Sequence, residues 1–95
     1  MKRVIKSSTA YMDDITESDK VKIKREVENM CYQCYDNDEL DYEVVMEHME
    51  AIVLDPEYLE DNEYSEGVIA LARSNNNEFI NYVGTLVQKE IENYA

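Results

Sequence analysis

Fifteen carboxylates and not one lysine or arginine lie between Glu26 and Glu66. Within that stretch only His48 could add positive charge. A surface charged so strongly in one sense repels itself and costs stability in a compact domain. The stretch is therefore either a solvated face with no further role or a surface whose electric field serves a function.

The charge is also distributed unevenly along the chain. The first 25 residues carry a net charge of +3, residues 26–66 carry −15, and the last 29 carry −1, which gives −13 for the whole chain. Phosphates would be repelled by such a protein, which argues against direct binding to DNA, RNA or an anionic membrane. The charge instead favours partners with basic surfaces.

The composition favours helices. Glycine occurs twice and proline once, whereas an all-β fold usually needs more turn residues. Apolar residues recur at helical spacing and nowhere alternate with a period of two over a useful length. We expect a single all-α domain over residues 1–95. Residues 1–15 form an arm or loop, extended or as a short strand, and residues 16–95 form a compact bundle of four to five helices.

The expected helices are bounded by capping residues. Thr16 or Ser18, Asp38, Asp55, Ser65 and Asn77 are the predicted caps. The corresponding helices end near residue 35, run over 39–54, form a short turn from 56 to 59 or 60, and run over 66–74 and 78–93.

No apolar run approaches the ~20 residues that span a bilayer. The N-terminus turns polar too early for a signal peptide. Two cysteines suit a reducing compartment. We therefore expect a soluble protein of the cytosol.

Cys31 and Cys34 form the one motif with chemical potential. A redox pair needs its first thiol at a helix N-terminus, whereas this pair lies near a predicted C-terminus beside Asp36 and Asp38, which raise a thiol pKa. A zinc site would need further ligands, and His48 is the only histidine. Packing in the core is the favoured interpretation, with zinc and redox roles as alternatives.

The acids that follow do not match a calcium loop or an enzyme site. In the window that begins at Asp36, Leu40 replaces an oxygen ligand and Asp41 occupies the position that needs glycine. The sequence contains no recognisable nucleophile, catalytic triad or glycine-rich phosphate loop. We expect no enzymatic activity, no cofactor and no metal.

Two other groups of residues could contact partners. One is a basic N-terminal cluster, for which pairing with the protein's own acids is favoured over binding an acidic partner: Lys2, Arg3, Lys6, Lys20, Lys22, Lys24 and Arg25. The other is a set of five tyrosines in the acid-only stretch: Tyr32, Tyr35, Tyr42, Tyr58 and Tyr64. About half of these rings should be core edges, and the rest would offer rigid contact area and cation–π faces.

Helical placement brings the acids into line. Over the expected second helix, Glu39, Glu43, Glu47 and Glu50 form a ridge opposite the apolar stripe, and Glu57, Glu60, Asp61 and Glu63 continue it. Such a ridge could occupy a basic groove that normally holds a phosphate backbone. The predicted partner-binding residues are these eight acids together with Tyr42, Tyr58 and Tyr64.

In length, charge and the tyrosine/acid texture of residues 26–66, the chain resembles the small acidic inhibitor proteins of phages and mobile elements. These include DNA mimics that inhibit restriction enzymes or uracil-DNA glycosylase, and anti-CRISPR proteins. The resemblance implies an anti-defence inhibitor that occludes the DNA- or RNA-binding site of a nuclease, such as a Cas effector, or of a DNA-binding protein. The alternative is an acidic interaction module, such as an antitoxin or a transcription-regulator partner, with a self-assembling structural protein less favoured.

Overall fold

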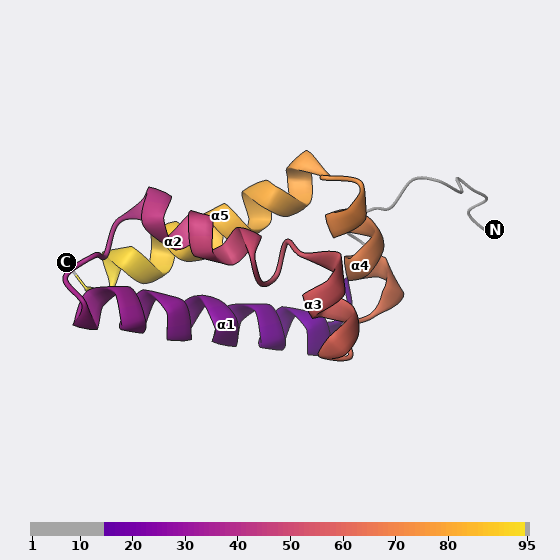
Figure 1. Ribbon diagram of the computed structural model, residues 1–95, viewed down its shortest axis with the longest axis horizontal. Coiled ribbons are helices and arrows are strands. Elements are labelled where there is room, and N and C mark those ends of the chain that lie inside the picture. The colour runs from indigo at the N-terminus through magenta and orange to yellow at the C-terminus, as the bar shows by residue number, and fades with distance from the viewer. Residues whose placement is uncertain (1–14, 95) are drawn as a thin grey trace.

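The structure, a computed structural model, describes residues 15–94 and shows a small all-α bundle (Figure 1). Of the arm predicted over residues 1–15, residues 1–14 lie outside the described residues. Within them the chain forms helices and connecting loops and no strand. The five helices are α1 (Glu17–Asp36), α2 (Tyr42–Glu50), α3 (Pro56–Asp61), α4 (Glu66–Arg73) and α5 (Asn77–Glu92). The prediction of four to five helices is confirmed.

The long helix α1 provides the base on which the other helices are arranged. Its 20 residues span about 30 Å. In Figure 1, α2 lies over the half of α1 near its C-terminus, α5 runs along most of α1, and α3 and α4 lie at the other end of α1. Helices α1, α2 and α5 pack against one another, and α3 packs against α4. The acid-rich segment 36–50 and the acid-rich segment 57–63 are therefore held at different ends of α1.

One continuous hydrophobic core joins the helices. The stripe on α1 is Ile23, Val27 and Cys31, spaced at four residues so that all three face the same side. On α2 the buried positions are Val45 and Met49, again four residues apart. The remaining fully buried side chains come from the loop after α2 and from the last three helices: Val53, Leu59, Val68, Leu71, Phe79, Val83 and Val87.

Side chains cap the helices at the places where the sequence favours them, with two corrections. Thr16 and Asp19 form a capping box on α1, while Asp55 and Ser65 cap α3 and α4. The second helix does not begin at Glu39, because Asp41 rather than Asp38 caps it, and it ends at Glu50 rather than Leu54. Helix α5 is capped by Asn76 rather than Asn77.

Asp38 fails as a cap because it ends the preceding helix. Its φ angle of 63° lies in the left-handed region, and the backbone N–H groups of Asp38 and Glu39 donate to the carbonyls of Tyr35 and Cys34. This is a Schellman motif, whose left-handed position is usually glycine. Helices α3 and α4 end in the same way, with Glu63 and Asn75 at the left-handed position. The chain thus makes three tight helix ends without glycine.

None of the helices in the described part of the chain is long and apolar enough to cross a bilayer.

Candidate protein-interaction surface

The outward face of α2 carries a row of carboxylates. Glu43, Glu47 and Glu50 are exposed and lie at i, i+4 and i+7, opposite the buried Val45 and Met49. Successive turns of a helix are about 5.4 Å apart, so the three carboxylates form a row along the helix axis with about this spacing. We call Glu43, Glu47 and Glu50 the α2 ridge. Glu39 precedes the helix and does not belong to this row, which corrects the four-residue spacing expected from the sequence.

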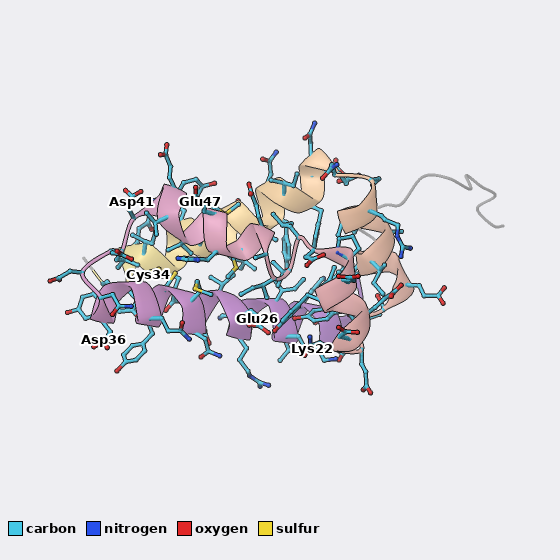
Figure 2. The ribbon with its side chains drawn as sticks, viewed as in Figure 1. Lys22, Glu26, Cys34, Asp36, Asp41 and Glu47 are labelled. Carbon is cyan, nitrogen blue, oxygen red and sulfur yellow. The ribbon has the colours of Figure 1, made fainter. Side chains whose placement is uncertain are left out.

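The loop between α1 and α2 extends this negative surface to one end of the molecule. Asp36, Asp38, Glu39 and Asp41 are all exposed there. The last turn of α1 contains no basic residue, so the negative end of the helix dipole adds to the charge of these side chains. In Figure 2, Asp41 and Glu47 lie on the side of α2 away from α1, and Asp36 lies at the end of α1 beside the same loop. We call Asp36, Asp38, Glu39 and Asp41 the acidic loop.

Exposed tyrosines accompany the acidic loop. Tyr32, Tyr35 and Tyr42 are 60%, 53% and 40% exposed, and Val21 is the other large hydrophobic side chain exposed within residues 15–94. The ring of Tyr35 packs against that of Tyr94, which follows the C-terminal end of α5, with centroids 4.7 Å apart and planes tilted by 38°. Tyrosine faces beside carboxylates are suited to guanidinium and ammonium groups, which pair with the acids and stack on the rings.

The two other tyrosines in the predicted site are not free surface anchors. Tyr64 is only 6% exposed, so its ring offers little surface to a partner, in contrast to the contact predicted from the sequence. Tyr58 is half-buried, and its hydroxyl donates to Glu26 Oε2 at 2.5 Å. This hydrogen bond, burial and the charge of Glu26 raise the pKa of Tyr58 to about 12. Both rings instead fasten the α3 region to α1.

The acids around α3 are exposed but partly compensated. Glu57, Glu60, Asp61 and Glu63 all reach solvent. Glu60 pairs with Arg73 of α4 at 3.1 Å. Nearby, Lys22 donates to the backbone carbonyls of Asn62 and Glu63, each at 3.1 Å, and its ammonium lies 5.1 Å from the centre of the Tyr64 ring. Figure 2 shows Lys22 beside α3, at the end of α1 remote from Asp36. The eight predicted acids therefore form two groups rather than one continuous ridge.

Within the described residues, the basic side chains that form ion pairs do so with acids around α3 and along α1 rather than with those of the α2 ridge or the acidic loop. The other ion pairs among residues 15–94 run along α1, where Lys20 pairs with Glu17 at 3.5 Å and Lys24 with Glu28 at 3.9 Å. Part of the basic cluster thus pairs with the protein's own acids, as favoured from the sequence. Lys2, Arg3 and Lys6 lie outside the described residues. Within the described part of the chain, no ion pair includes a residue of the α2 ridge or the acidic loop.

Cys31 and Cys34 are buried free thiols of the core. Burial, together with the charge of Glu90 and the neighbouring Cys34, raises the pKa of Cys31 to about 11, which keeps the unreactive thiol form at neutral pH. His48 is exposed on α2. The described residues contain no group of three or more His, Cys, Asp or Glu side chains that could hold a metal ion.

Comparison of the chain with protein families, with curated proteins and with solved structures gives no match.

Proposed function

We propose that this protein is an acidic inhibitor that mimics nucleic acid and occludes the basic DNA- or RNA-binding site of a nuclease or DNA-binding protein. The observation that carries this proposal is the exposed α2 ridge with its adjoining acidic loop, which no cation of the described residues pairs with. A charge that a protein keeps exposed and uncompensated at a cost in stability is available to a partner of opposite charge.

The spacing of the charges supports the nucleic-acid comparison. From Glu43 to Glu50 the helix rises about 10 Å and presents three carboxylates, one for each ~5 Å of axis. A DNA strand presents one phosphate for each ~3.4 Å of axis. The acidic loop adds four more charges at the N-terminal end of α2. The surface therefore approaches the charge density of one strand.

The eight acids predicted from the sequence fall into two groups with different roles. We assign the electrostatic contact to Glu39, Glu43, Glu47 and Glu50 with Asp36, Asp38 and Asp41, and the aromatic contact to Tyr32, Tyr35 and Tyr42. The second group, Glu57, Glu60, Asp61 and Glu63, lies beside Lys22 and Arg73 and contributes less. No catalytic step is part of this proposal.

A second candidate is an interaction module for the basic helix or tail of another protein, such as an antitoxin or a regulator of a transcription factor. It is favoured by the exposed tyrosines, because a phosphate mimic needs only charge, whereas a protein segment also gains from aromatic contacts. The two candidates differ in one respect. Nucleic acid should displace the chain from its partner in the first case and need not do so in the second.

The test captures partners from a lysate of the source organism on the immobilised chain at low salt, then elutes them with duplex DNA. A nucleic-acid-binding protein should be released by the duplex. The double variant E43K/E47K should capture much less of it. The matched control is E17K/E78K, which changes the net charge equally at two exposed acids in the first turns of α1 and α5. Equal capture by the two variants would show that overall charge, and not the α2 ridge, attracts the partner.

A further inference from the structure

Helices α2, α4 and α5 enclose a groove directly beside the α2 ridge. Its volume is about 380 Å³, at the lower end of the ~300–1,000 Å³ typical of ligand pockets. Met46 and Leu54 line it from the α2 side, Ala72 from α4 and Ile80 from α5. Met46, Leu54 and Ile80 are half-buried, so apolar side chains of this groove remain in contact with water.

The lining contains two polar residues, one from α2 and one from the turn between α4 and α5. Glu50 and Asn75 are its polar members, and Glu50 also belongs to the α2 ridge. Along α2, Met46 is three residues after Glu43 and four before Glu50, so its side chain lies between these two carboxylates on the helix surface. A carboxylate, an apolar side chain and a second carboxylate therefore follow one another within two turns of α2.

We propose that this groove binds an apolar side chain of the basic partner, presented by an amphipathic helix whose lysine or arginine residues pair with Glu43 and Glu50. This inference rests on the basic partner of the proposed function and adds what that partner must carry. An amphipathic helix places residues three and four apart on one face, which matches the spacing of Glu43, Met46 and Glu50.

The groove is suited to such an anchor. Phe79 and Leu71, which are fully buried, form the floor and back of its walls together with the core. Met46 is unbranched and adapts its shape to an incoming side chain. A side chain that fills a pocket ringed by polar contacts carries a large share of the binding energy of an interface, whereas charges at its rim mainly set the rate of association.

The experiment uses two synthetic helical peptides with the same number and spacing of lysines, one bearing a leucine stripe and the other alanines at those positions. Affinities of the full chain for both peptides are measured at low salt by calorimetry. The wild type should bind the leucine peptide about tenfold more tightly, as expected for burial of one large apolar side chain.

Two pairs of matched variants test whether the preference for the leucine peptide arises in the groove. Ala72→Leu fills the groove and should remove the preference, whereas Ala70→Leu, on the exposed face of the same helix, should retain it. Met46→Gln keeps the length of the side chain but makes it polar, and should reduce the preference about fivefold or more. Its control is Met30→Gln, at a half-buried methionine of α1 outside the groove. Met46→Gln keeps the test valid if Ala72→Leu fails to fold.

Equal affinity of the wild type for both peptides would overturn the groove while leaving the acidic contact intact. So would a preference that survives in both Ala72→Leu and Met46→Gln. Failure of both peptides to bind at low salt would overturn the basic partner itself, and with it this inference. A wild-type dimer that Ala72→Leu converts to monomers would assign the groove to a second copy of the chain instead.

Discussion

Asp19 of α1 accepts two hydrogen bonds from Ser65, one from the backbone N–H at 3.0 Å and one from the hydroxyl at 2.6 Å. The same carboxylate also accepts from the backbone N–H of Thr16 at 2.9 Å. Ser65 is the cap of α4, so a single buried carboxylate joins the N-termini of α1 and α4. It is the one charged residue buried within residues 15–94.

Asp19→Asn should therefore lower the free energy of unfolding by about 1–3 kcal/mol at neutral pH, because three hydrogen bonds lose their charged acceptor. Glu17→Gln, at an exposed acid of the same helical turn, should change it by less than about 0.5 kcal/mol. Urea denaturation of both variants gives the comparison. Equal stabilities would contradict a role for Asp19 in joining the two helices.

The same carboxylate predicts a dependence on pH. Burial alone would raise the pKa of Asp19, but the hydrogen bonds from Ser65 and Thr16 outweigh it and hold the pKa below its ordinary value of 3.8. A carboxylate whose pKa is lowered by folding contributes stability that is fully present above the unfolded pKa and is lost as the pH falls through the folded pKa. The acid limb of the stability curve below about pH 4 should accordingly be shallower in Asp19→Asn than in the wild type.

Tyr58 predicts the opposite behaviour at high pH. Its pKa is raised to about 12 by its hydrogen bond to Glu26, by burial and by the charge of Glu26, so its contribution is present below about pH 10 and is lost as the pH rises through 12. Tyr58→Phe should cost about 1–3 kcal/mol at neutral pH, and this difference should shrink above pH 10. Tyr32→Phe, at an exposed ring, is the control. A constant difference across this range would show that Tyr58 acts through packing alone.

Gly84 of α5 lies against the tip of Tyr42 from α2. A Cβ atom added at Gly84 would lie 2.5 Å from the Tyr42 hydroxyl oxygen but 3.6 Å from the ring carbon that bears it. Because alanine is favoured over glycine inside a helix by about 0.5–1 kcal/mol, Gly84→Ala should stabilise the protein in a Tyr42→Phe background. In the wild-type background the gain should be smaller, since the hydroxyl must move. A double-mutant cycle of urea denaturation curves measures the coupling, and additive effects would contradict this contact.

Glu63 offers a test of the strained helix ends. Its φ angle of 62° lies in the left-handed region, which costs a non-glycine residue about 1–2 kcal/mol. Glu63→Gly should increase the free energy of unfolding by about 1 kcal/mol, whereas Glu63→Gln removes the same charge without relieving the backbone and should change stability little. If the two variants are equally stable, the gain comes from charge rather than from backbone conformation.

The regular parts of the fold could be predicted because they follow from local rules. Helical spacing identified the buried stripe of Val45 and Met49, and the caps Asp55 and Ser65 were recognisable from residue type. The start of α2 could not be predicted, because aspartate is favoured both as a helix cap and at a left-handed position. Asp38 takes the second role and Asp41 the first.

The candidate site was harder to predict because it depends on contacts between distant parts of the chain. Acids at helical spacing correctly placed Glu43, Glu47 and Glu50 on the outward face of α2. Tyr58 and Tyr64 also stand among acids in the sequence, yet they pack beside Glu26 and Lys22, more than 30 residues away. The groove lined by Met46 and Ile80 has no local sequence signal, because its walls come from three helices.

The claim that the acidic surface takes the place of nucleic acid is tested most directly by displacement of a labelled duplex from the captured partner. Fluorescence anisotropy follows the release of the duplex as the chain is added. The wild type should release it fully. The variant E43Q/E47Q, in which two carboxylates of the α2 ridge are neutralised, should need at least about tenfold more protein to release half of the duplex. The control E17Q/E78Q should stay within about twofold of the wild type. A partner that binds the chain and the duplex at the same time, so that the anisotropy stays high or rises as the chain is added, would contradict the mimicry.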